Sequence, residues 1–127
     1  MAVKLLSPQE ALSIWPEAKA QLNRAFEFSY TDTVDDYWRE VEQGRAQLWM
    51  VDSGYSLTKV IDGKKRVLQY IAIAGENMDA WLSEFLKQSQ QWAKSHGCVE
   101  AILSGRRGWE KKLSGFKLER VTLTKEL

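Results

Sequence analysis

The residues best suited to chemistry are few and lie in the second half of the chain. The segment Gly105–Gly108 holds Arg106 and Arg107 between two glycines, and paired guanidinium groups on such a turn could bind a phosphate or a carboxylate. We favour the simpler interpretation, a turn with solvated arginines. His96 is the only histidine and has no Ser, Cys or acid at a spacing typical of a catalytic group. We therefore expect His96 to make a favourable contact with the C-terminal end of a helix.

A metal site is not predicted. Cys98 is the only cysteine, so an internal disulfide and a cysteine pair for a metal are both excluded. We expect Cys98 to begin an inner strand as a small buried apolar residue. Asp35 and Asp36 follow Thr33 at a helix start, where capping and the helix dipole account for them.

Composition sets limits on the partners. A net charge of +1 over 127 residues favours neither nucleic acid nor an anionic membrane as a partner. The N-terminal apolar stretch is too short for a signal peptide, and no run reaches the ~18 apolar residues of a membrane helix. We expect a single domain over residues 1–127 in the cytoplasm, which would be the host cytoplasm or a virion if the protein is viral.

Six tryptophans are spread along the chain. We favour core packing as their role. The alternative is a surface for a protein partner, because large aromatic residues also anchor interfaces. That alternative predicts an exposed Trp38 or Trp109.

Hydrophobic periodicity predicts an α/β (α+β) fold with a mixed central sheet flanked by helices. A strand over 2–6 precedes a helix capped by Ser7 and Glu10, which Pro16 should kink or restart. A helix from Thr33 to Gly44 follows. Strands are predicted over 47–52, 55–61 and 65–74, with a hairpin at Asp62-Gly63 whose two turn residues need positive φ.

The second half contains the clearest helix. Its apolar positions run from Trp81 to Ala93, Asn77 is the expected cap, and Gly97 is the expected stop. A strand over 98–103 comes next, parallel to the strand before the helix. A short helix over 109–113 and a last strand over 116–126 complete the prediction.

This order of elements resembles the GCN5-related N-acetyltransferase fold over essentially the whole chain. The most specific local match is Trp109–Phe116, which is similar to that family's aromatic residue followed by Glu-Lys-Leu-Gly-Phe, with two small insertions. In active members, the loop after the fourth strand binds the pyrophosphate of coenzyme A. The matching segment here is Gly75–Asp79, which has one glycine, no basic residue and two carboxylates.

The resemblance implies a coenzyme A site, which the two carboxylates make unfavourable. Glu76 and Asp79 would satisfy the helix N-terminus themselves and repel a diphosphate. If acetyl-CoA binds, the implied contacts are Ile71, Ile73, Gly75, Asn77, Arg106 and Arg107. The weak catalytic candidates are Glu76, as a base, and Lys111, as an acid where active members often have a tyrosine.

We therefore expect an acetyltransferase-like domain that has lost acetyl-CoA catalysis, needs no cofactor and acts through protein–protein contacts. The Gly105–Trp109 stretch also looks similar to small tailed-phage proteins, which suggests a virion or assembly role. A homo-oligomer is left open. The alternative is an active N-acyltransferase that uses acetyl-CoA with atypical phosphate contacts, and a third, weaker one is an unrelated small-ligand binder.

Overall fold

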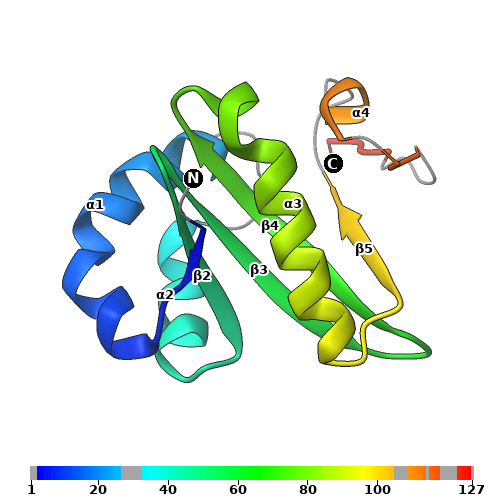
Figure 1. Ribbon diagram of the computed structural model, residues 1–127, viewed down its shortest axis with the longest axis horizontal. Coiled ribbons are helices and arrows are strands. Elements are labelled where there is room, and N and C mark those ends of the chain that lie inside the picture. Colours follow the sequence, from blue (N-terminus) through cyan, green and yellow to red (C-terminus); the bar gives the residue numbers. More distant parts are fainter. Residues whose placement is uncertain (1–2, 27–32, 105–108, 114, 118–122, 127) are drawn as a thin grey trace.

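A computed structural model describes residues 3–26, 33–104, 109–113, 115–117 and 123–126, excepting the side chains of residues 110 and 111. In chain order the elements are β1 (Lys4–Leu5), α1 (Pro8–Phe26), α2 (Val34–Glu42), β2 (Ala46–Val51), β3 (Gly54–Asp62), β4 (Arg66–Gly75), α3 (Met78–Ser95), β5 (Glu100–Leu103) and α4 (Trp109–Lys112). Figure 1 shows this arrangement.

The strands form one mixed sheet in the order β1-β2-β3-β4-β5. The first three pairings are antiparallel, and β5 runs parallel to β4. The predicted mixed sheet flanked by helices is therefore confirmed. None of the helices in the described part of the chain has the length and apolarity that crossing a bilayer requires.

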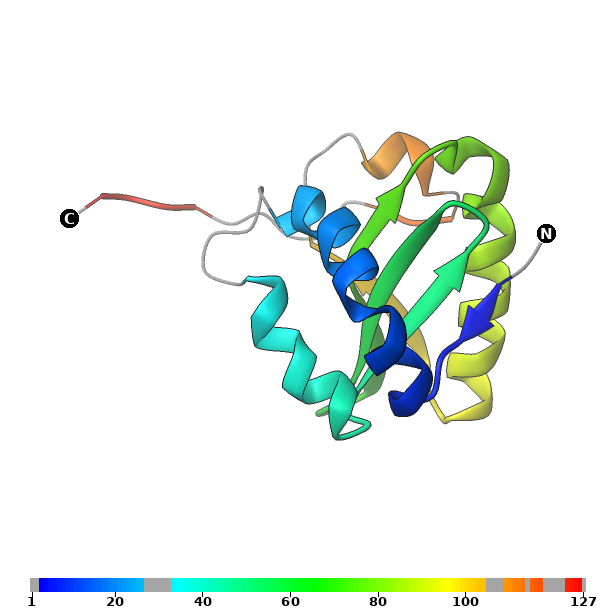
Figure 2. The same cartoon turned by 90° about the vertical axis from the view of Figure 1, so that its left-hand side faces the viewer.

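Helices cover both faces of the sheet. α1 and α2 lie on one face and α3 on the other (Figures 1 and 2). The core is accordingly divided in two. Ala18, Leu22 and Leu57 belong to the cluster beneath α1 and α2, whereas Trp81 and Phe85 of α3 pack with strand residues on the opposite face. The apolar run of β4 is buried on both sides, as expected of an inner strand.

The helix ends follow local chemistry. At the start of α1, the backbone N–H of Ser7 donates to Glu10 Oε1 (3.0 Å) and the N–H of Glu10 donates to Ser7 Oγ (3.2 Å), which is the predicted capping box. α3 ends before Gly97, whose φ of +85° suits glycine. α1 continues through Pro16 as one helix, so the predicted restart is wrong. Pro16 lies on the solvent side, where the carbonyl that loses its partner can bind water.

Three further predictions need correction. The β3–β4 hairpin forms, but residues 63–65 connect the strands and neither Asp62 nor Gly63 has positive φ, because a three-residue connection replaces the two-residue turn. Cys98 is buried but precedes β5, which begins at Glu100. The strand expected over 116–126 is absent from its described residues, 116–117 and 123–126. The rest of that range lies outside the described residues.

A bulge in β4 shapes the sheet. Leu57 of β3 pairs with Ala72, and the next residue, Thr58, pairs with Tyr70, so Ile71 is an extra residue without a partner in β3. Such a residue bends its strand. On the other side, β4 pairs with β5 only from Val67 to Tyr70. The bulge therefore coincides with the place where β4 separates from β5.

Candidate functional site

The second half of β4 has a backbone edge that is unpaired within the described part of the chain. Beyond Tyr70, residues Ile71–Gly75 pair with β3 on one side and with no described residue on the β5 side. Backbone N–H and C=O groups at such an edge can bond an extended ligand that contains amides, as in strand addition. Ile71, Ile73 and Gly75, which the resemblance singled out, all lie on this stretch.

The loop after β4 is held in place by three hydrogen bonds. The N–H of Glu76 donates to the Ser53 carbonyl (3.0 Å), and the Glu76 carbonyl accepts from Ser53 Oγ and Trp81 Nε1, each at 2.8 Å. Gly75 has φ of +151°, and a Cβ there would lie 2.5 Å from Gly54 Cα. Gly75 is thus required by the close approach of β3. The loop delivers the chain to α3 in one fixed conformation.

The two carboxylates near the start of α3 do not cap the helix as the sequence suggests. Asn77 is at the N-cap position, as predicted, but has left-handed φ and ψ of 57° and 37° and makes no side-chain cap hydrogen bond. Asp79 Oδ1 instead pairs with Lys112 Nζ of α4 at 3.2 Å. Within the described residues, neither Glu76 nor Asp79 accepts a hydrogen bond from the first turn of α3. The expectation that they would satisfy this helix end is therefore wrong.

A basic groove continues from this helix end. It has a volume of about 610 Å³ and follows the outer side of α3 from Asp79 and Lys112 to Lys94. Lys87 and Lys94 lie two turns apart on α3, and the buried side chains of Leu82 and Leu86 form its base. Three lysines against one aspartate make this groove suitable for an anion.

The groove lysines are functional candidates that the sequence interpretation missed. Lys87 and Lys94 are exposed polar positions of α3, and the apolar pattern that predicts the helix assigns them no chemistry. The seven-residue spacing of Lys87 and Lys94 on one helix side was the available signal. The contribution of Lys112 could not be found from spacing, because it depends on how α4 packs.

The remaining predicted site residues are placed only in part. Glu76 is exposed on the fixed loop, within reach of the open edge by chain position. Lys111 is in α4, but its side chain lies outside the described residues, as do Arg106 and Arg107. The assignment of these residues to catalysis or cofactor binding stays a prediction. His96 lies at the opposite end of α3 and is not part of this site.

The aromatic residues are used mainly in packing. Trp49 and Trp81 are buried, and the other four tryptophans are half-buried. Trp38 packs against Trp15 with ring centroids 4.7 Å apart and the rings tilted by 33°. Neither Trp38 nor Trp109 is the exposed anchor that a partner surface predicted.

Tyr70 is also committed to the interior. Its hydroxyl lies 2.6 Å from Ser89 Oγ, and burial raises its pKa despite hydrogen bonds to Ser89 and Gln90. It is the last residue of β4 that pairs with β5. Tyr70 therefore lies where the unpaired edge of β4 begins, and its hydroxyl is not available as a general acid at that edge.

Comparisons with solved structures identify the architecture. A tetramutant of the BH1408 protein from Bacillus halodurans superposes with a TM-score of 0.76 at 11% identity, covering 100% of both chains. An aminoglycoside acetyltransferase from an uncultured soil metagenomic sample, in complex with sisomicin, gives 0.71 at 12% identity over 99% of this chain and 95% of that one. The ribosomal-protein-alanine N-acetyltransferase from Brucella melitensis gives 0.65 at 12% identity over 98% and 99%.

This chain has a GCN5-related N-acetyltransferase-like fold. No family model and no curated protein matches its sequence. At identities this low, the structural likeness establishes the fold, and function depends on the site.

Proposed function

We propose that this protein binds acyl-CoA along the open edge of β4 and transfers the acyl group to an amine. The observation that carries the proposal is the separation of β4 from β5 at Ile71, which leaves the edge Ile71–Gly75 beside the start of α3. The amide-containing pantetheine arm has the chemistry to hydrogen-bond this edge. Its diphosphate would meet the N-terminal end of α3, which favours anions.

Charge in the groove also supports acyl-CoA binding. The loop before α3 lacks a basic residue, but Lys87, Lys94 and Lys112 line the adjoining groove. Lys112 also pairs with Asp79 and so offsets one of the two carboxylates expected to repel a diphosphate. Arg106 and Arg107 remain predicted phosphate contacts.

Acyl transfer requires two proton movements. The amine nitrogen forms a bond to the thioester carbonyl carbon and loses a proton, the carbon–sulfur bond breaks, and the leaving sulfur takes a proton. Glu76 is the base predicted from the sequence, because Asp79 is engaged with Lys112. Since Glu76 lies at the diphosphate end of the edge, it would take the proton through a chain of water molecules. Lys111 is the predicted acid.

Calorimetry with acetyl-CoA is the direct test of binding. We expect saturable binding with one site per chain, and a stabilisation of about 2.7 kcal/mol when the ligand is at 100 times its Kd. The double variant Lys87→Glu/Lys112→Glu should weaken binding by more than tenfold, since both charges are reversed. Lys64→Glu, in the exposed hairpin connection, is the matched control and should bind as the wild type does.

Release of free coenzyme A thiol tests transfer. Sisomicin and a peptide that begins with alanine are suitable first acceptors to try, because one structural neighbour is an aminoglycoside acetyltransferase in complex with sisomicin and another is a ribosomal-protein-alanine N-acetyltransferase. Glu76→Gln should lower turnover at least tenfold, and the Kd of acetyl-CoA should also fall about twofold at physiological salt, because one carboxylate near the diphosphate is removed. Turnover equal to that of the wild type would remove Glu76 as the base.

A second candidate function is a non-catalytic domain that acts through protein contacts. The observation in its favour is chemical: Glu76 and Asp79 put two carboxylates at the start of α3, and Trp109–Lys112 of α4 contains no tyrosine. A virion or assembly role in a tailed phage belongs to this candidate. It would be preferred if millimolar acetyl-CoA left the melting temperature unchanged and the full chain formed a stoichiometric complex with another protein of its source.

A further inference from the structure

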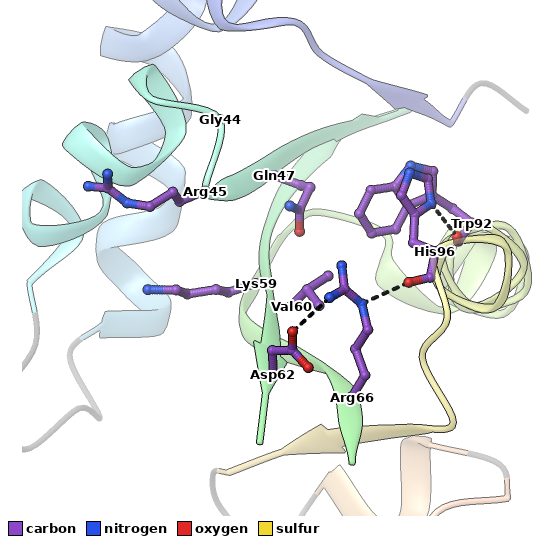
Figure 3. Close-up of a pocket in the computed structure, with 9 residues that line it drawn as sticks. All are labelled: Gly44, Arg45, Gln47, Lys59, Val60, Asp62, Arg66, Trp92 and His96. Carbon is purple, nitrogen blue, oxygen red and sulfur yellow. Dashed lines mark hydrogen bonds and ion pairs between the residues drawn. The ribbon is translucent and has the colours of Figure 1, made fainter. Parts of the chain in front are cut away.

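A separate pocket of about 450 Å³ lies at the opposite end of the sheet (Figure 3). Its walls come from the starts of β2 and β4, the end of β3 and the last turns of α3. Arg66 in this pocket and Gly75 at the open edge are the two ends of β4. At ~3.3 Å per residue they are about 30 Å apart. A volume of this size is typical of small-molecule sites.

Arg66 is a fixed donor in the pocket. Its Nε donates to the carbonyl of His96 (2.8 Å), and its Nη1 donates to Asp62 Oδ2 (3.1 Å). These two contacts orient the guanidinium plane before any ligand arrives. The Nη2 group has no partner among the described residues, so it retains two N–H donors for a ligand.

Gln47 is a second oriented donor. The indole Nε1–H of buried Trp49 donates to Thr58 Oγ1, and that hydroxyl can then donate to Gln47 Oε1, each at 2.9 Å. The indole uses one lone pair of the Thr58 hydroxyl, and the hydroxyl proton is donated to Gln47 Oε1, so the amide oxygen of Gln47 faces Thr58. Its NH₂ group has no partner in the described part of the chain. Figure 3 shows Gln47 and Arg66 in the same pocket.

Two stacked rings form the wall beside these donors. The rings of Trp92 and His96 have centroids 4.2 Å apart. His96 Nδ1 lies 2.8 Å from the carbonyl of Trp92, so Nδ1 carries a proton and the ring orientation is fixed. Val60 adds an apolar surface. A flat apolar group could pack here while its polar end meets the donors.

The local charge favours a single negative charge. Arg45 and Lys59 line the pocket with their stems, and their charged ends point away from it (Figure 3) toward Glu40. These contacts, with Arg45 first, hold the pKa of Glu40 below its usual value. Inside the pocket Arg66 and Asp62 balance each other. The one unbalanced positive charge therefore belongs to the cluster of Arg45, Lys59 and Glu40 on the outer side of the pocket, within a Debye length of a bound anion.

We propose that this pocket is a second ligand site, which binds a small monocarboxylate with a flat apolar body through the Arg66 guanidinium and the Gln47 amide. The site does not depend on acyl-CoA binding, because no described residue is shared by the two sites. Benzoate is the probe that matches this chemistry. Benzamide keeps the shape without the charge, and inorganic phosphate supplies an anion without the apolar body.

The test is NMR titration of the full chain with these three probes. We expect benzoate to shift the Gln47 side-chain NH₂, the Arg66 Nε–H and the Trp92 indole resonances with one saturable Kd. Benzamide and phosphate should bind at least tenfold more weakly. Equal shifts with benzamide, tighter binding of phosphate, or no saturable shift with benzoate would each overturn the proposal.

Matched variants locate the site. Gln47→Glu keeps an acceptor for Thr58 but replaces the NH₂ donors by a negative charge, and should weaken benzoate binding at least tenfold. Arg66→Met should do the same. Lys64→Met removes one positive charge outside the pocket and should change the Kd less than twofold. The melting temperature of each variant checks folding, and a folded Gln47→Glu protein with wild-type affinity would refute the site.

Discussion

Asp79→Asn should strengthen acetyl-CoA binding while weakening the fold. Asp79 is 91% exposed and pairs with Lys112 beside the start of α3. The substitution removes a negative charge next to the proposed diphosphate position and releases the lysine. It also removes an acid from the first turn of a helix, where acids are stabilising. The two effects have opposite signs, so they can be separated by measuring affinity and stability on the same variant.

The expected magnitudes follow from simple electrostatics. One unit charge about 7 Å from a group with about two negative charges raises its energy by roughly 1.2 kcal/mol in water, which is about eightfold in Kd. Screening at physiological salt reduces this to about twofold. The lost charge–dipole interaction and surface ion pair should lower the free energy of unfolding by about 0.5–1 kcal/mol.

Calorimetry at low and physiological salt and urea unfolding followed by tryptophan fluorescence would measure both effects. Glu42→Gln is the matched control, because it removes the same charge from an exposed position of α2, on the opposite face of the sheet. It should leave the affinity for acetyl-CoA unchanged. An Asp79→Asn protein with unchanged or weaker acetyl-CoA affinity at low salt would refute the electrostatic reasoning.

Three further predictions concern the stability of the fold. Ser89 donates to the Phe85 carbonyl, so Tyr70 must donate to Ser89; we expect Ser89→Ala to cost about 1–2 kcal/mol, Tyr70→Phe about 1 kcal/mol, and the double variant less than their sum in urea unfolding. The Lys4 side chain and the Ser7 backbone N–H lower the pKa of Glu10 from 4.5 to about 2, so its stabilising contribution is present above pH 4.5 and is lost as pH falls toward 2. Acid titration of Glu10→Gln should show a shallower loss over that range, and an unchanged curve would contradict this assignment. Gly75→Ala would put a Cβ 2.5 Å from Gly54 Cα, and we expect a loss of at least about 3 kcal/mol, measured by thermal unfolding; a fully stable variant would show that β3 can move away.

Much of the fold could be predicted because local chemistry and hydrophobic pattern agree. The Ser7–Glu10 capping box, the apolar side of α3 and the stop at Gly97 are properties of short segments. They depend little on the rest of the chain. The parallel pairing of β5 with β4 followed from the helix between them.

The open edge and the groove could not be predicted in the same way. The bulge at Ile71 depends on the registers of two neighbouring strands, and an isoleucine in an apolar run carries no sign of it. The pairing of Asp79 with Lys112 joins residues 33 positions apart. The sequence placed both acids at the helix start correctly, but it could not show that one of them is turned toward a lysine of α4.

The extra residue in β4 has a consequence for the backbone dynamics of the strand. On the N-terminal side of this residue, the amides of residues 67–70 lie between two strands, so their protons should exchange slowly with solvent. On its C-terminal side, alternate N–H groups of residues 71–75 point to opposite edges of the strand. One of those edges has no strand partner among the described residues. Hydrogen exchange along this strand should therefore change from uniformly slow to alternating slow and fast at a single residue, and a ligand that occupied the edge would remove the alternation.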